Sequence, residues 1–158
     1  MRPATSPTAL RVQAALGPSF TVLEFEASTR TAADAAAAIG CTVGQIAKSL
    51  VFRTLGSDRP VLIVASGPNR VSEAKAARVV GEPIGRADAR YVRDRTGFAI
   101  GGVPPVGHAQ ALTTVVDRSL SAFDAIWAAA GTPQAVFRLS FDDLVRLTGG
   151  TVADVTED

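Results

Sequence analysis

A short loop combines glycine and proline in a pattern that suits binding through main-chain amides. Residues 101–108 read Gly101-Gly102-Val103-Pro104-Pro105-Val106-Gly107-His108. Glycine tolerates positive φ and lets a ligand approach the backbone, whereas proline fixes φ and holds one loop shape. Free N–H groups on such a loop suit a carbonyl oxygen or a developing oxyanion. The alternative is a structural proline turn between two strands. The Gly-Lys-Ser/Thr ending of a Walker A loop is missing.

Lys48 is the second candidate, because it directly precedes an apolar strand pattern at residues 49–54. Only Lys48 and Lys75 are lysines among the 16 basic residues. In a chain where arginine is the usual cation, a lysine indicates a position that needs a compact ammonium, which can hold a phosphate or polarise an ester. A helix-end lysine that contacts the last carbonyls is the alternative, and spacing alone favours it.

The other reactive side chains have simple structural explanations. His108 is the only histidine and could act as general base or hydrogen-bond donor, although a single loop histidine is more often structural. Ser72 and Lys75 resemble half of a Ser–Lys pair, but helix capping explains Ser72 more economically. Cys41 is expected to be a half-buried thiol without a special role. The charged run at residues 90–95 is typical of a solvated helix face.

Composition narrows the class of protein. The chain has 158 residues, of which 47% are hydrophobic and 20% charged, so it is long and apolar enough to form one folded domain. A formal net charge of +1 argues against a general duplex-DNA binder but leaves room for one nucleic-acid end in a local site. One cysteine and one histidine make a zinc site improbable. No apolar run reaches membrane-spanning length and no signal-peptide core is present, which predicts a cytoplasmic protein.

Periodicity and turn signals predict a mixed α/β (α+β) fold, a single compact domain with a curved mixed sheet flanked by helices. Residues 1–8 are expected to form a flexible tail, and residues 9–158 the domain. Helices are predicted at residues 8–16, from a cap at Ser28 or Thr31 to 39, and at 42–48, 72–80, 87–95 and 142–147. Strands are predicted at residues 20–26, 49–54, 61–65, 98–100, 112–116, 125–130, 135–139 and 152–155. Lys48 is therefore expected at a helix-to-strand junction.

Three segments together resemble one known family. They are QIAKSLVF at residues 45–52, VLIVASG at residues 61–67 and GGVPPVGH at residues 101–108. In this order and at these intervals they resemble the YbaK/ProX aminoacyl-tRNA deacylases, also called the prolyl-tRNA synthetase-associated editing domain. The resemblance covers about residues 20–150, nearly the whole chain. It implies a compact α/β fold with a cleft and hydrolysis of mischarged aminoacyl-tRNA of the tRNA-Pro type.

The resemblance also implies a division of roles within the site. Lys48 falls on the family lysine that contacts the tRNA 3′ end or the ester, and Gly101 and Gly102 fall on the loop whose amides bind the aminoacyl group. The remaining substrate contacts that it implies are Ser49, Val103, Pro104, Pro105, Gly107 and His108. No metal, cofactor or protein nucleophile is required, since the terminal ribose hydroxyl or a substrate thiol assists in several members.

The partners that follow are the aminoacyl-tRNA 3′ acceptor end and prolyl-tRNA synthetase, with no duplex DNA and no membrane, for a monomer or homodimer. Cysteinyl-specific members carry a serine–proline pair and a later glutamine where this chain has Pro104-Pro105 and His108. This difference makes His108 a candidate specificity residue. A non-catalytic module that binds a nucleotide or the acceptor end is the alternative function, because binding and cleaving an ester use the same contacts.

Overall fold

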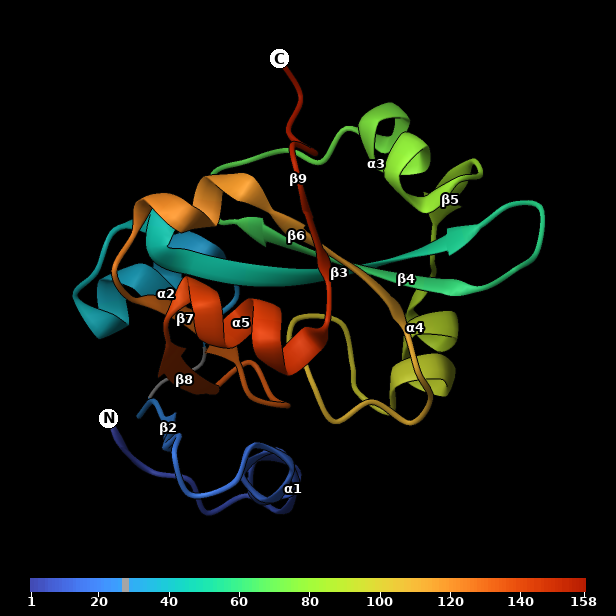
Figure 1. The fold of residues 1–158 in the computed structure, drawn as a ribbon. Coiled ribbons are helices and arrows are strands. Elements are labelled where there is room, and N and C mark those ends of the chain that lie inside the picture. The colour runs from blue at the N-terminus through green and yellow to red at the C-terminus, as the bar shows by residue number, and fades with distance from the viewer. Residues whose placement is uncertain (27–28) are drawn as a thin grey trace.

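A single mixed β-sheet organises the chain (Figure 1). The computed structural model describes residues 1–26 and 29–158. The main strand order is β1-β2-β8-β7-β3-β4-β6-β9, and β5 pairs with β3 beside this path. Parallel and antiparallel neighbours both occur, which confirms the predicted mixed α/β class.

The strands of the sheet have the following bounds: β1 (Arg2–Pro3), β2 (Val22–Glu24), β3 (Ile46–Thr54), β4 (Pro60–Ser66), β5 (Ile84–Arg86), β6 (Thr113–Asp117), β7 (Ile126–Ala129), β8 (Ala135–Leu139) and β9 (Thr151–Ala153). The helices are α1 (Pro7–Leu16), α2 (Ala32–Ile39), α3 (Glu73–Val80), α4 (Ala89–Thr96) and α5 (Phe141–Thr148), with two 3₁₀ turns, η1 (Val43–Gln45) and η2 (Arg118–Ala122). Among the described helices, none is both long and apolar enough to cross a membrane.

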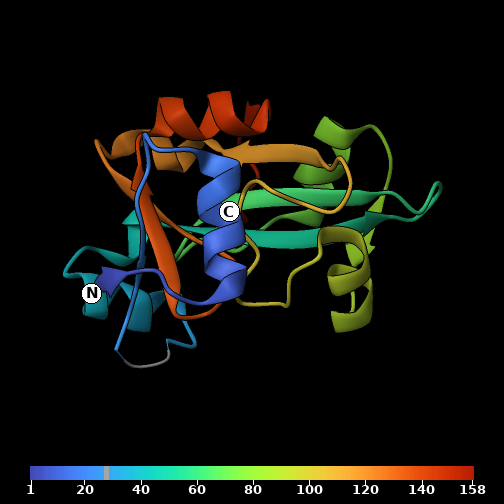
Figure 2. The ribbon, with the colours of Figure 1, turned by 90° about the horizontal axis from the view of Figure 1, so that it is seen from below.

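The strands predicted at residues 49–54 and 61–65 pair as the β3–β4 hairpin, which lies at the centre of the sheet. All seven residues of β4 are buried, and β3 pairs with them from Ala47 opposite Ser66 to Arg53 opposite Pro60. In Figure 1, α3 lies on one side of this hairpin and α4 on the other. Two core clusters reflect this: Val61 and Ile63 pack with Ala76 of α3, whereas Leu62 and Val64 belong to the cluster that holds Val92 of α4. Figure 2 shows the same hairpin from below, and Leu144 of α5 belongs to the same core cluster as Val92 of α4.

Helix boundaries follow capping chemistry. Thr31 caps α2 by accepting the Asp34 N–H at 3.1 Å, and Gly40 ends this helix with a φ of +87°, a conformation that favours glycine. Ser140 and Asp143 form a capping box at the start of α5. The other proposed cap of α2, Ser28, lies outside the described residues.

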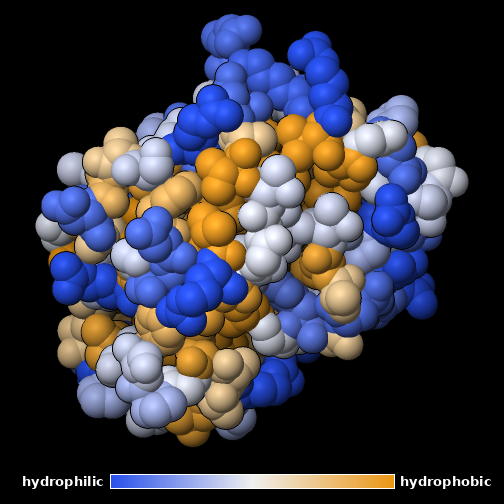
Figure 3. Space-filling view, viewed as in Figure 1, coloured by the Kyte–Doolittle hydropathy of each residue, from blue (hydrophilic) through white to orange (hydrophobic). Residues whose placement is uncertain are grey.

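Ser72 is a helix cap, so it does not form the suggested catalytic pair with the Lys75 side chain. Its hydroxyl accepts the Lys75 N–H at 3.2 Å at the start of α3. The Lys75 ammonium instead contacts the C-terminal residues, at 3.0 Å from Asp154 and 2.9 Å from Asp158. Figure 3 shows hydrophilic side chains gathered at this end of the molecule. Lys75 therefore holds the C-terminal segment in place.

Three local predictions differ from the structure, and two elements were not predicted. The segment predicted as a helix at residues 42–48 contains only the single turn η1, and β3 already begins at Ile46, so Lys48 lies inside a strand. Residues 98–100 form no strand, because a turn begins there. Strand β5 and turn η2 were not predicted. Residues 1–8, the expected tail, contain β1 and the first turn of α1, and the buried Glu24 carboxylate accepts the N–H groups of Thr5 and Ser6.

Strand β3 has an open edge that positions the site. On the side opposite β4, β7 pairs only with Ile46 and Ala47, and β5 pairs only with residues 52–54. No described strand pairs with residues 48–51 on that side. The sheet therefore splits at this point, and an edge of main-chain donors and acceptors is left between β7 and β5.

Candidate functional site

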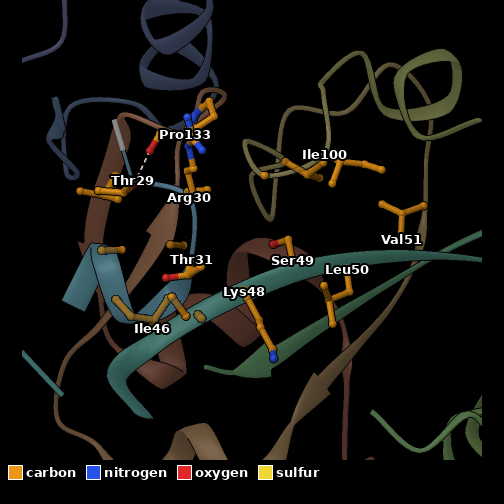
Figure 4. A pocket seen from close by; sticks show the side chains of 18 of the residues that line it. Thr29, Arg30, Thr31, Ile46, Lys48, Ser49, Leu50, Val51, Ile100 and Pro133 are labelled. Carbon is orange, nitrogen blue, oxygen red and sulfur yellow. Dashed lines mark hydrogen bonds between the residues drawn. The ribbon is translucent and has the colours of Figure 1, made fainter. Parts of the chain in front are cut away.

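A pocket of about 440 Å³ occupies the gap at the open edge of β3 (Figure 4). Its size lies in the range of roughly 300–1,000 Å³ that is usual for small-molecule sites. Four segments supply most of the wall: residues 29–32, which lead into α2, residues 46–52 of β3, residues 100, 101 and 103, and the turn between β7 and β8 at residues 132–133. Because consecutive residues of β3 contribute from both faces, the pocket wraps around the strand edge.

The main chain of β3 presents hydrogen-bonding groups to this pocket. The Thr54 N–H donates to Arg59 O on the β4 side at 2.9 Å, whereas the Leu55 N–H donates to Pro83 O on the other side at 2.9 Å. Successive residues of a strand alternate in direction. Ser49 and Val51, an even number of residues before Leu55, therefore direct their N–H and C=O groups to the open edge.

The Ser49 side chain also faces the pocket. Figure 4 shows its hydroxyl directed toward the space between Arg30 and Ile100. Ser49 Oγ is buried and has no hydrogen-bond partner among the described residues. Buried polar atoms without a partner are rare and destabilising, so this hydroxyl is a strong candidate for contact with a ligand.

Lys48 lies on the opposite face of β3 from Ser49, as expected for neighbours in a strand (Figure 4). Its ammonium donates to Gly67 O at 3.0 Å. Desolvation by burial lowers the pKa of Lys48 below its ordinary value, and the nearby charge of Asp117 opposes this shift. The ammonium is therefore a compact and poorly hydrated charge next to the pocket.

Asp117, which the sequence analysis did not single out, organises the environment of Lys48. It is fully buried, and its carboxylate accepts the Ser66 N–H at 3.0 Å and the Asn69 Nδ2 at 2.9 Å. These contacts hold the turn that carries the Gly67 carbonyl. A Cβ at Gly67 would lie 2.3 Å from Val43 O, so only glycine fits there.

The two central glycines of the loop have different environments. Gly101 lines the pocket at the third position of a turn with a φ of +92°, which is the geometry of a type II turn. No hydrogen bond within the described residues uses the Gly101 N–H. The Gly102 N–H, in contrast, donates to Ala99 O at 3.0 Å, and Gly102 O accepts the Gly131 N–H at 2.9 Å.

Gly102 packs the loop against the β7–β8 turn and does not line the pocket. A Cβ there would meet Gly131 O at 2.7 Å and Thr132 Cα at 2.8 Å. Its expected role as a free amide donor does not fit this structure, because its N–H is already engaged. Only backbone without a side chain allows such a close approach.

The rest of the loop lies largely behind the pocket wall. Val103 is buried and lines the pocket, whereas Pro104, Pro105 and Gly107 do not. His108 does not line it either: its Nε2 lies 2.7 Å from Pro104 O, and its ring packs edge-on against Phe98 with centroids 6.5 Å apart. Burial lowers the pKa of His108. This histidine therefore stabilises the loop through its contacts with Pro104 and Phe98.

Several lining residues were missed by sequence reasoning. Arg30 and Arg86 are exposed, and Ile100 keeps 59% of its surface accessible. Arg30 and Ile100 lie on opposite sides of the space above Ser49 (Figure 4). Arg30, Lys48 and Arg86 are cationic, and none of the described lining residues is acidic. An exposed arginine in a loop or at a strand end carries no signal of its own in an arginine-rich sequence.

Sequence comparison identifies the class of protein that this fold and pocket define. Residues 26–147 match the model of the aminoacyl-tRNA editing domain, which spans most of the chain. The chain belongs to the aminoacyl-tRNA editing domain family, which confirms the resemblance found in its motifs.

Individual relatives cover the chain almost end to end. A protein described as a candidate trans-editing enzyme for prolyl tRNA synthetase has a structure with a TM-score of 0.93 and 48% identity, covering 98% of this chain and 100% of that one. The hypothetical protein APE2540 gives a TM-score of 0.85 and 31% identity over 95% of this chain and 99% of its own. The uncharacterized protein YwhH of Bacillus subtilis strain 168 is 35% identical over 138 residues, 87% of each chain.

Proposed function

We propose that this chain hydrolyses the ester bond of mischarged aminoacyl-tRNA, of the tRNA-Pro type, and releases the amino acid and the free tRNA 3′ end. The observation that carries the proposal is the pocket at the open edge of β3, which Ser49, Lys48 and Gly101 all line, in a member of the aminoacyl-tRNA editing domain family. The description of one relative as a candidate trans-editing enzyme for prolyl tRNA synthetase supports the choice of tRNA and suggests that synthetase as a partner. Such a substrate would place the reaction in the cytoplasm.

The charge of the pocket suits the end of a nucleic acid. Arg30 and Arg86 stand exposed at the wall and can pair with the last phosphates of the acceptor strand. A local cluster of this kind provides affinity for one phosphate-bearing end without the global positive charge of a duplex binder. The apolar part of the wall then receives the aminoacyl group.

Main-chain donors are proposed to bind the reacting ester. The N–H groups of Ser49 and Val51 point to the open edge, and the Gly101 N–H is free on the facing loop. When a water molecule or the terminal ribose hydroxyl attacks the ester carbonyl, negative charge develops on the carbonyl oxygen. Preorganised N–H donors stabilise such an oxyanion because they need no reorientation during the reaction.

Lys48 is proposed to stabilise the same developing charge. The burial that lowers its pKa also removes water that would otherwise screen the ammonium, so its field acts over the edge of β3 more strongly than a surface lysine would. Gly67 O holds the ammonium in place beneath the strand. Gly102 and His108 then act as positioning residues that keep the loop against the β7–β8 turn.

Release of amino acid from a panel of misacylated tRNAs tests the proposal. We expect at least one mischarged tRNA-Pro to lose its amino acid much faster than by spontaneous hydrolysis, and correctly charged prolyl-tRNA to be spared. If every ester decays at its spontaneous rate while the tRNA still binds, the chain is a binding module and the hydrolase proposal is wrong.

A further inference from the structure

Several polar side chains of the pocket wall already form hydrogen bonds within the protein, and one buried hydroxyl of the described wall does not. The Thr29 hydroxyl donates to Pro133 O at 2.5 Å, and the Thr31 hydroxyl accepts the Asp34 N–H. The Thr132 hydroxyl accepts the Gln134 N–H at 3.3 Å, and the Lys48 ammonium donates to Gly67 O. Ser49 Oγ is the buried polar side-chain atom of the described wall that has no partner in the protein.

The wall to which Ser49 belongs is mainly apolar. Ala47 and Val51 share its face of β3, and the lining also holds Val92, Val103 and larger side chains such as Trp127. With cations and no carboxylate among the described lining residues, the pocket disfavours a positively charged aminoacyl side chain. A neutral side chain therefore fits this lining, and one that ends in a hydroxyl can pair with Ser49.

We infer that Ser49 determines specificity, and that its hydroxyl bonds the hydroxyl of a short aminoacyl side chain such as seryl or threonyl. The inference rests on the proposed function and adds the substrate class. It predicts that a hydroxylated side chain is preferred over an apolar one of the same shape, because the apolar side chain leaves the buried Ser49 hydroxyl unpaired. Seryl and 2-aminobutyryl groups make the cleanest pair, since they differ only by OH against CH₃.

The expected preference is large enough to measure. One buried hydrogen bond made or lost changes binding by roughly tenfold to hundredfold. Replacement of Ser49 by alanine removes both the donor and the unpaired hydroxyl, so the preference should fall to within about threefold of unity. Ser49→Thr keeps a hydroxyl on a strand position that tolerates β-branched side chains and should restore most of the preference.

Binding and hydrolysis should be measured separately. Calorimetry with 3′-seryl-amino-3′-deoxyadenosine and its 2-aminobutyryl counterpart reports binding alone, because the amide is not cleaved. Rates of release from seryl-tRNA and 2-aminobutyryl-tRNA report the reaction. Thr132→Ala is the matched control: it removes a wall hydroxyl that already serves the protein, and the seryl to 2-aminobutyryl ratio should not change.

The outcomes distinguish the inference from the proposed function. A seryl preference that Ser49→Ala abolishes supports the inference, and its appearance in binding without any hydrolysis rejects only the proposed function. Hydrolysis with no preference, or with a preference that Ser49→Ala leaves intact, overturns the inference alone. An equal loss for both ligands in Ser49→Ala also overturns it, because the hydroxyl would then serve the ester and not the side chain. If neither analogue binds and no ester is cleaved, both are wrong.

Discussion

Replacement of Lys48 by methionine separates a catalytic charge from a structural one. Methionine keeps an unbranched apolar stem of similar length and removes only the ammonium. Within the described part of the chain this ammonium makes one hydrogen bond, to Gly67 O at 3.0 Å, and its pKa is lowered mainly by desolvation. Loss of that bond and of the attraction to Asp117 is opposed by the relief of desolvation, so we expect the free energy of unfolding to fall by only about 1–2 kcal/mol.

The effect on the reaction should be much larger. Removal of one group that stabilises a developing oxyanion typically lowers kcat by about 10²- to 10³-fold, or roughly 3–4 kcal/mol. Single-turnover release of amino acid from mischarged tRNA-Pro measures kcat directly, and chemical denaturation of the same samples measures stability. Lys75→Met is the matched control, since the only other lysine holds the C-terminal residues through Asp154 and Asp158. We expect this control to keep full activity.

The pH dependence of stability offers an independent check on the same lysine. Because the pKa of Lys48 is lower in the folded than in the unfolded chain, the unfolded chain binds more protons between that lowered value and the ordinary 10.5. The wild type should therefore gain stability from this group as the pH rises through that window, and Lys48→Met should lack the gain. Undiminished turnover in Lys48→Met, or a loss of activity that only follows unfolding, would refute the assigned role.

Three further predictions follow from the loop and the pocket mouth. Gly102→Ala should destabilise the fold by about 1–3 kcal/mol and lower activity, because its Cβ would lie 2.7 Å from Gly131 O. A Cβ at Gly101 meets nothing closer than 4.0 Å, so Gly101→Ala should cost only about 1–2 kcal/mol, from its φ of +92°. Thermal denaturation measures both losses of stability. His108→Gln should remove a loss of stability seen as the pH falls below 6.5, because the lowered pKa of His108 makes the unfolded chain bind more protons there, and equal pH profiles would contradict this. Arg86→Ala should reduce the slope of log affinity against log salt for an acceptor-strand oligonucleotide by about 0.7, whereas an unchanged slope would remove this arginine from the phosphate contacts.

Local chemistry made much of the fold predictable from sequence. Thr31 and Ser72 were recognisable as caps because a small hydroxyl precedes a helical pattern, and each caps its helix in the structure. The β3–β4 hairpin followed from two apolar runs around a polar turn. A helix was predicted at residues 42–48 because Thr42 and Gln45 form a capping box, which is a helix-start signal. This box begins only one 3₁₀ turn, and strand β3 follows from Ile46.

The pocket itself depends on long-range pairing that no local pattern contains. The open edge of β3 exists because β7 pairs with only two of its residues and β5 with three. Sequence therefore indicated Lys48, Ser49, Gly101 and Val103 through family motifs, but not the opposite faces of Lys48 and Ser49. The same family motif assigned Gly102 and His108 to the ligand, whereas their contacts with Gly131, Ala99 and Pro104 became visible only in three dimensions.

The central claim is that the open edge of β3 binds the aminoacyl ester. Amide chemical shifts, followed by NMR while 3′-seryl-amino-3′-deoxyadenosine is added, test it most directly. We predict that the largest shifts occur at the N–H groups of Ser49, Val51 and Gly101, with little change at Gly102, whose N–H is bonded to Ala99 O. Saturable binding that leaves Ser49, Val51 and Gly101 unshifted would contradict the account.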